Sequence, residues 1–201
     1  MFPYRKMIKA ITGGLALCLL LSLGGLYGRC EGVRQRVVRL HVLAHSDSRE
    51  DQALKLQVRD AVVQAAAGWL DGAATTEEAL AAAEARLPAL EAVARQTVQT
   101  AGYDYPVRVE LTRMYFTTRQ YDTVTLPAGI YDAVRVTIGA GAGQNWWCVV
   151  YPPLCAGAAT DRSTLSQVLD PSQEALVSGG DRYIVKFKVM EWLEALLHIF
   201  R

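Results

Sequence analysis

A basic segment followed by an uncharged one at the N-terminus constrains this chain more than any other feature. Arg5, Lys6 and Lys9 precede a run without charged side chains from Ala10 to Leu26. This order of a basic and an apolar region is typical of an export signal. As a helix the run would reach about 25 Å, slightly less than the roughly 30 Å hydrocarbon core of a bilayer, so removal and retention as an anchor both remain open. We therefore expect residues 1–28 to be a signal peptide or membrane anchor.

The remaining residues, 29–201, are predicted to form one domain on the side of the membrane away from the cytoplasm, because the basic residues mark the inner end of the apolar run. The whole chain has 21 Lys and Arg against 20 Asp and Glu, a formal net charge of +1. That balance does not supply the basic surface on which nucleic-acid binding depends, so we expect no nucleic-acid partner.

The spacing of apolar residues predicts a strand, then helices, then several strands. Residues 37–43 alternate between apolar and polar side chains, as in a half-buried strand. An Ala-rich region with helical periodicity follows from about Arg49 to Gly102, and Pro88 within it predicts a kink or two abutting helices. Segments rich in Val, Thr, Tyr and Phe predict strands at 106–112, 114–118, 130–138 and 145–151.

This order of elements predicts an α+β fold. We expect a mostly antiparallel sheet covered by an Ala-rich helical layer and preceded by the N-terminal signal or anchor helix. Residues 156–181 are small and polar and are predicted to be a mobile insertion, with or without a short helix. A last strand is predicted at 183–188, and an amphipathic helix at 191–200.

A polar motif stands where the first predicted helix begins. Ser46, Asp47 and Ser48 are helix N-cap residue types, and Ser48 with Asp51, or Asp47 with Glu50, imitates a capping box. The motif continues along the polar face of the helix with Gln52, Lys55 and Arg59. Because the stretch lacks the alternating ligands and glycine turn of a calcium loop, we interpret it as a structural cap and predict no metal site.

The cysteines suggest a disulfide without requiring one. Cys18 lies in the apolar run and Cys30 just beyond it, which leaves Cys148 and Cys155 as a pair in the body. An exported domain could join them in a small loop, or carry them as two thiols. Their spacing does not fit a zinc site.

Two features could suggest chemistry, and neither has the required context. The glycines at 139, 141 and 143 precede a predicted strand, whereas a nucleotide cradle would precede a helix. A Cys148 nucleophile would need a histidine base, and no local signature supports one. We therefore predict no catalytic residue, no cofactor and no small-molecule substrate.

A cluster of aromatic and proline residues is the candidate for partner binding. Adjacent strand residues point to opposite faces, so one of Trp146 and Trp147 should enter the core while the other faces outward. An exposed Trp beside a rigid proline turn is typical of a recognition hot spot. In the alternative interpretation, both tryptophans belong to the core, one on each face. The candidate partner-binding residues are Asn145, Trp146, Trp147, Pro152 and Pro153.

These motifs together resemble the stage II sporulation protein R family of endospore-forming bacteria. The resemblance covers residues 37–155 almost continuously and resumes near residue 183. Its most specific part is Asn145-Trp146-Trp147-Cys148 with Pro152-Pro153-Leu154-Cys155. It also includes residues 39–48, Asp51 to Lys55, Val58 to Asp60, Tyr103 to Val107, Leu126 to Gly129, Ile138-Gly139, Lys186 to Lys188, and Glu191-Trp192.

The resemblance implies signalling rather than catalysis. Proteins of this family are exported from the forespore into the space between the two membranes, where they trigger a membrane-embedded aspartic protease that removes the pro-sequence of sigma factor E in the mother cell. The expected partners are therefore that protease and, through residues 10–26, the membrane. The alternatives are an exported cell-wall or thiol-dependent enzyme and a structural module of the cell wall.

Overall fold

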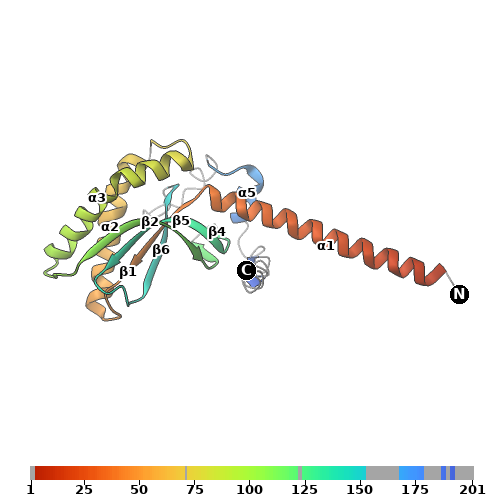
Figure 1. Ribbon diagram of the computed structural model, residues 1–201, viewed down its shortest axis with the longest axis horizontal. Coiled ribbons are helices and arrows are strands. Elements are labelled where there is room, and N and C mark those ends of the chain that lie inside the picture. Colours follow the sequence, from red (N-terminus) through yellow and green to blue (C-terminus); the bar gives the residue numbers. More distant parts are fainter. Residues whose placement is uncertain are drawn as a thin grey trace.

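The structure is a computed structural model that describes residues 3–70, 72–121, 124–152, 168–178, 187–188 and 191–192. Within these residues, a sheet is covered on one face by helices α2 and α3, and helix α1 extends away from this body (Figure 1). The helices are α1 (Pro3–Gln35), α2 (Arg49–Leu70), α3 (Thr76–Thr100) and α5 (Pro171–Val177). The α+β prediction is thereby confirmed.

The main sheet has the strand order β2-β5-β1-β6, and a small β3-β4 hairpin adjoins it. The strands are β1 (Val38–Leu43), β2 (Val107–Phe116), β3 (Arg119–Tyr121), β4 (Val124–Leu126), β5 (Gly129–Ile138) and β6 (Asn145–Tyr151). β2 with β5 and β1 with β6 are antiparallel, but β1 and β5 are parallel. The sheet is therefore mixed. The parallel pair is feasible because the long segment through α2, α3 and β2 returns the chain to the start of β5.

The Ala-rich helices form the predicted layer on one face of the sheet. Leu40 and Val42 of β1 and Val136 of β5 are buried against Leu54 and Leu90 of the helices. Small side chains such as Ala79, Ala83 and Ala94 are almost fully buried in this layer, so the helix backbones can approach the sheet closely. α3 runs without interruption through Pro88, and the predicted alternative of two abutting helices is wrong.

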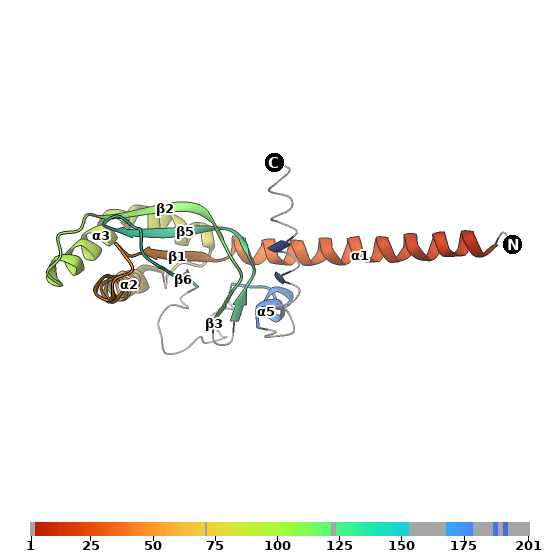
Figure 2. The same cartoon turned by 90° about the horizontal axis from the view of Figure 1, so that it is seen from below.

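A second core lies on the opposite face of the sheet. Phe116, Tyr131 and Val149 of the sheet pack there with Val33 of α1 and Leu126 of β4. Leu169 and Val177 close this core near α5 (Figure 2). Because of this second core, the sheet lies between two layers along part of its length.

Two expectations about the strands need correction, and one pair of strands was not expected. β2 is a single strand where two were expected, because Arg113, at the expected break, pairs in register with Asp132 of β5. The β3-β4 hairpin was not predicted. Phe187 and Lys188 are helical, so the last strand predicted at 183–188 is wrong at those two positions, and its other residues lie outside the described part.

The C-terminal half of the predicted insertion contains a short helix. α5 begins at Pro171, with Asp170 as a capping-box N-cap, and ends at Val177. The structure does not describe the other residues of this insertion, which are 156–167 and 179–181. Of the helix predicted at 191–200 it describes only residues 191 and 192.

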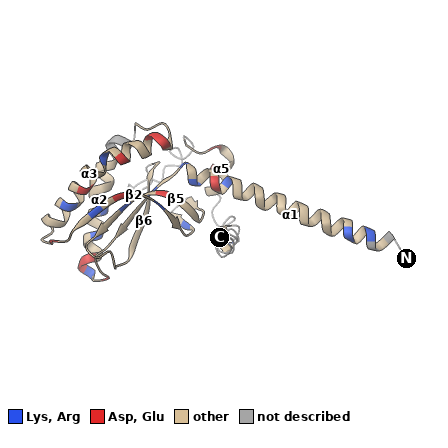
Figure 3. Ribbon diagram, viewed as in Figure 1, with Lys and Arg blue, Asp and Glu red and all other residues tan. Residues whose placement is uncertain are grey.

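α1 joins the N-terminal segment to the domain without a break. The helix has 33 residues, and the predicted boundary at residue 28 falls within it. From Lys6 to Gln35 it is long and apolar enough to cross a membrane, and its most apolar window is not buried in the domain. Figure 3 shows basic residues near its N-terminal end, then a long stretch without charge before the domain. These properties fit a signal or anchor helix.

Candidate functional site

The predicted cap residues form a hydrogen-bonded turn between β1 and α2. The Ser48 hydroxyl accepts the N–H of Asp51 at 3.1 Å, and the Ser46 hydroxyl accepts the N–H of Ser48 at 3.2 Å. Ser48 is thus the N-cap of α2 and satisfies one of the donors at the helix start. The Ser46 hydroxyl also donates to the Asp51 carboxylate, which is 4% exposed. This hydrogen bond holds the pKa of Asp51 below its usual value.

The same turn is joined to the loop between β5 and β6. The backbone N–H of Gln144 donates to Asp47 Oδ1 at 2.6 Å, and Lys55 Nζ donates to the Gln144 carbonyl at 3.0 Å. Lys55 Nζ also donates to Gln52 Oε1. Only 5% of Lys55 is exposed, and burial lowers the pKa of its ammonium group. The motif therefore connects two chain segments as well as capping a helix.

The glycine-rich loop fits against this turn, and its glycines are required for close approach. A Cβ atom on Gly143 would lie 2.1 Å from the Ser46 carbonyl oxygen. Gly139 has φ +57°, and a Cβ atom there would lie 2.2 Å from Nδ1 of His45. That nitrogen accepts the N–H of Ala140 at 2.9 Å. The loop connects β5 to β6 past the end of β1, which lies between these two strands in the sheet, so it is not the hairpin loop that the glycines suggested. It is hydrogen-bonded to the backbone of Ala44 and His45 and does not form a phosphate cradle.

Trp146 and Trp147 point to opposite faces of the sheet, as the strand periodicity predicts. Both are half-buried, and each packs against the core on its own face of the sheet, which is closer to the alternative interpretation than to one core and one exposed tryptophan. Trp146 lies on the helical face, where the guanidinium of Arg59 is 4.3 Å from its ring centroid. Arg59, the last residue of the cap motif, therefore lies away from the turn and covers a tryptophan.

Trp147 lies on the other face, in a cluster of rings. It stacks on His41 with centroids 4.3 Å apart and meets Phe116 edge-on at 4.8 Å. The guanidinium of Arg119 is 5.5 Å from its centroid. Arg119 is exposed, so this indole is partly screened by a side chain that solvent surrounds. Trp146 is therefore covered by a residue of α2, and Trp147 by the exposed Arg119 of β3.

Arg39 lies deeper in the same face and was not singled out by sequence reasoning. It has no exposed surface, donates from Nε to the Cys148 carbonyl at 3.1 Å, and donates from Nη2 to the Tyr121 hydroxyl at 2.7 Å. Its guanidinium lies over the rings of Phe116 and Tyr131, at 4.4 and 5.0 Å. Within the described residues it forms no ion pair, and Nη1 has no hydrogen bond. The sequence shows Arg39 only as a polar residue that alternates with apolar ones in a strand. That pattern normally indicates an exposed side chain, so it does not predict the burial of Arg39.

The other candidate residues lie at the two ends of β6. Asn145 is exposed at its start, and Pro152, after a cis peptide bond with Tyr151, is buried at its end. Cys148 is disulfide-bonded. Pro153 and Cys155 lie outside the described residues, so the Cys148–Cys155 pairing and the role of Pro153 stay predictions.

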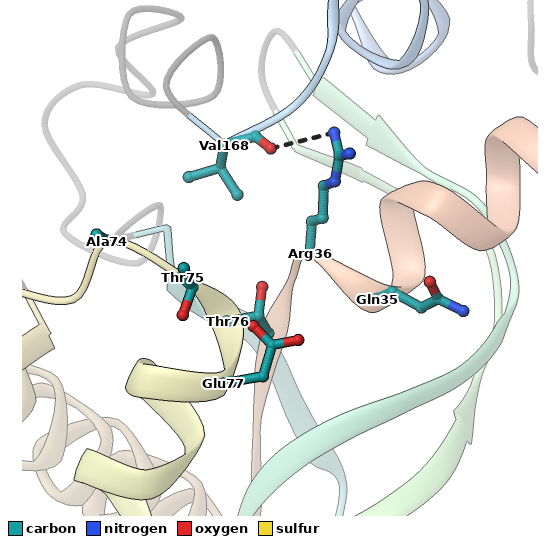
Figure 4. Close-up of a pocket in the computed structure, with 7 residues that line it drawn as sticks. All are labelled: Gln35, Arg36, Ala74, Thr75, Thr76, Glu77 and Val168. Carbon is teal, nitrogen blue, oxygen red and sulfur yellow. Dashed lines mark hydrogen bonds between the residues drawn. The ribbon is translucent and has the colours of Figure 1, made fainter.

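A pocket of about 300 Å³ lies between the end of α1, the start of α3 and the segment before α5 (Figure 4). Arg36 projects across it and donates to the Val168 carbonyl at 3.4 Å and to Gln173 Oε1 at 2.7 Å. The guanidinium of Arg36 thus already has hydrogen-bond acceptors within the protein. In the part of the chain that the structure describes, no group of three or more His, Cys, Asp or Glu is placed to hold a metal ion.

The features of this chain recur in known proteins. The model of a family described as stage II sporulation protein R matches residues 34–161, which include the β1–α2 turn, both tryptophans and Cys148. Stage II sporulation protein R of Bacillus subtilis (strain 168) is 38% identical over 123 residues, which cover 61% of this chain and 55% of that relative. The match thus spans little more than half of the relative's length. No solved structure matches the chain.

Proposed function

The chain belongs to the stage II sporulation protein R family, and from this premise we propose that it is an exported signalling protein of sporulation. It would pass from the forespore into the intermembrane space and there activate a membrane-embedded aspartic protease, which processes pro-sigma-E to active sigma-E in the mother cell. The observation that carries this proposal is the family match over residues 34–161, which includes the whole main sheet and the helical layer.

The N-terminal helix supports the exported location. Its basic residues precede the apolar stretch, so insertion with the basic end in the cytoplasm places the domain on the other side. The helix would either remain as an anchor or be cleaved. In both cases the domain reaches the space in which a protease of the facing membrane is accessible.

Activation requires that the domain bind one state of the protease more tightly than another. A preference of a few kcal/mol is enough to change the populations of two such states substantially. Binding of this kind needs an accessible surface and no catalytic group on the activator. The exposed side chains next to the tryptophans, Asn145 and Arg119, meet this requirement.

We place the protease contact at the exposed start of β6, on the face of Trp147. Asn145 is exposed there, and the indole of Trp147 is covered partly by the exposed Arg119. Trp146, by contrast, lies under Arg59 on the helical face. Aromatic and arginine side chains of this kind often dominate interface energies.

The test is co-expression of this chain, its membrane protease and pro-sigma-E in a heterologous cell, with and without residues 1–28. Processing of the precursor that depends on the exported chain is the expected result. Processing that occurs equally without the chain would refute the signalling role.

Variants then locate the contact. Asn145→Ala and Arg119→Ala should reduce processing while the domain keeps its unfolding temperature, because both side chains are exposed. Arg108→Ala is the matched control, since its side chain is 75% exposed on β2, at the opposite edge of the sheet. Unchanged processing in the first two variants would remove the contact from this face.

The alternative of a thiol-dependent enzyme is less well supported. A cysteine nucleophile acts as a thiolate, and Cys148 is disulfide-bonded. A Cys148→Ala variant that folds without the disulfide and still promotes processing would exclude the thiol chemistry.

A further inference from the structure

The end of the apolar run coincides with the point where α1 enters the domain. Residues 10–21 of α1 are exposed, whereas Leu26 and Cys30 are buried against the domain. Arg34, one turn further on, is 4% exposed and donates to the carbonyl of Ala128. If α1 spans a bilayer, the headgroup region on the domain side therefore lies near residues 26–29.

A second part of the chain is fixed at the same level. Phe187 has no exposed surface and packs with Leu26, Cys30 and Leu176 in a small apolar cluster. The piece at 187–188 accordingly lies against α1 through Phe187. Phe187 is thus held at the base of α1, where a membrane surface would be.

Two exposed aromatic side chains stand close in the sequence to these buried residues: Tyr27 follows Leu26, and Trp192 is five residues after Phe187. Trp192 is 77% exposed, more than any other large hydrophobic side chain in the described part of the chain, and Tyr27 is 42% exposed. Trp and Tyr are enriched at membrane–water interfaces, because an apolar ring enters the lipid while its polar atom remains at headgroup level. An exposed Trp on the segment that Phe187 attaches to α1 matches this preference.

Charged groups beside them are compatible with lipid headgroups. Lys188 is 59% exposed at its side chain and pairs with Glu191 at 3.0 Å. Arg29, exposed on α1, is the first charged residue after the apolar run. Long basic side chains in such positions can extend to phosphate groups while their stems cover apolar surface.

We propose that Tyr27 and Trp192 form a contact with the bilayer surface, which holds the domain against the membrane. This contact rests on the anchored form of the proposed function, in which α1 stays in the bilayer. Its occupant is lipid, because the patch continues directly from the membrane-spanning helix. The C-terminal segment, attached through Phe187, would then be a second point of membrane attachment.

Quenching of tryptophan fluorescence by brominated lipid tests the contact. The full-length chain is placed in nanodiscs of phosphatidylcholine and phosphatidylglycerol with bromine atoms just below the headgroups. We expect strong quenching for the unchanged chain and loss of most of it in Trp192→Phe. Trp147→Phe is the matched control and should keep the quenching, because that residue lies on the sheet. Phe187→Ala should also reduce quenching, since it releases the segment from α1.

Quenching that is the same in Trp192→Phe and the unchanged chain would overturn the proposal. So would an unquenched Trp192 whose replacement weakens co-purification with the protease, because the patch would then bind protein. The processing assay separates this question from the proposed function. Quenching without protease activation would refute the signalling role alone, and activation without quenching would refute the lipid contact alone.

Discussion

The imidazole of His41 stacks on the indole of Trp147 across the antiparallel β1–β6 pair, with centroids 4.3 Å apart and planes inclined by 17°. His41 is 4% exposed, and burial lowers its pKa, although the Asn145 side chain acts in the opposite direction. The neutral ring is therefore the form that this site favours.

The first prediction concerns the effect of acid on this stack. The unfolded chain takes up a proton on His41 near pH 6.5, before the folded chain does. Stability should therefore fall as the pH decreases below about 6.5 and level off once the folded state is also protonated. Thermal unfolding between about pH 7.5 and about pH 5.5 measures this decline. His41→Phe, which keeps a ring against Trp147, should lose the part of the decline due to this residue. An identical pH profile in that variant would contradict the prediction.

The second prediction concerns the Asp51 carboxylate. Its folded-state pKa is depressed, so its stabilising contribution is present above about pH 4 and is lost as the pH falls through the folded pKa. Asp51→Ala should lower the free energy of unfolding by about 1–3 kcal/mol, because Ser46 loses its acceptor in a buried site. Asp60→Ala is the control and should change little, since its side chain is 68% exposed. Urea titration at neutral pH compares the two.

The third prediction concerns the buried guanidinium of Arg39. Arg39→Ala removes its packing against two aromatic rings and the donors to Cys148 and Tyr121, and should cost about 3 kcal/mol or more. Arg39→Met should cost less, because it fills part of the space and buries no charge. We expect denaturant titration to show that Arg39→Ala is less stable than Arg39→Met, and the reverse order would contradict the packing role of this side chain.

The fourth prediction concerns the loop that meets the β1–α2 turn. Gly143→Ala places a methyl group against the backbone of Ser46, which cannot move as a flexible side chain would, and should destabilise the domain by about 1–3 kcal/mol. Gly72→Ala is the matched control, because a Cβ atom there meets nothing within 4 Å. Equal unfolding temperatures for the two variants would argue against the tight fit.

The fifth prediction concerns the disulfide of Cys148. Cys148→Ser and Cys155→Ser should each lower the free energy of unfolding by about 2–3 kcal/mol and by similar amounts, if these two residues are bonded to each other. Non-reducing peptide mapping should recover the two cysteines in one linked fragment. A linkage of Cys148 to any other cysteine would refute the pairing.

Local features of the fold were predictable from the sequence, because they depend on neighbouring residues. The alternation in residues 37–43 predicted β1, and the serines before Arg49 predicted the cap at which α2 begins. The opposite faces of Trp146 and Trp147 followed from the strand periodicity alone. The parallel pairing of β1 with β5 did not follow, because it depends on how a long intervening segment packs.

The candidate site was less predictable, because its side chains meet across distant segments. Arg59 covers Trp146 from α2, and Arg119 approaches Trp147 from β3, so the burial of the two indoles depends on residues that the strand periodicity does not reveal. Lys55 is buried because Gln144, far along the chain, supplies an acceptor. A local sequence pattern does not predict such contacts between segments that are far apart in the chain. Arg39 is the clearest case, since its burial depends on rings from three other strands.

Two residues, Arg36 and Val37, separate the last turn of α1 from the first residue of β1. In the anchored form, this short connection joins the domain rigidly to the membrane-spanning helix. The domain therefore cannot move freely away from the membrane, as it could on a long flexible linker. The helix from Leu26 to Gln35 rises by about 14 Å, which sets the height of the sheet above the lipid. A partner in the facing membrane would have to come within that fixed reach, so the signal should depend on how closely the two membranes approach.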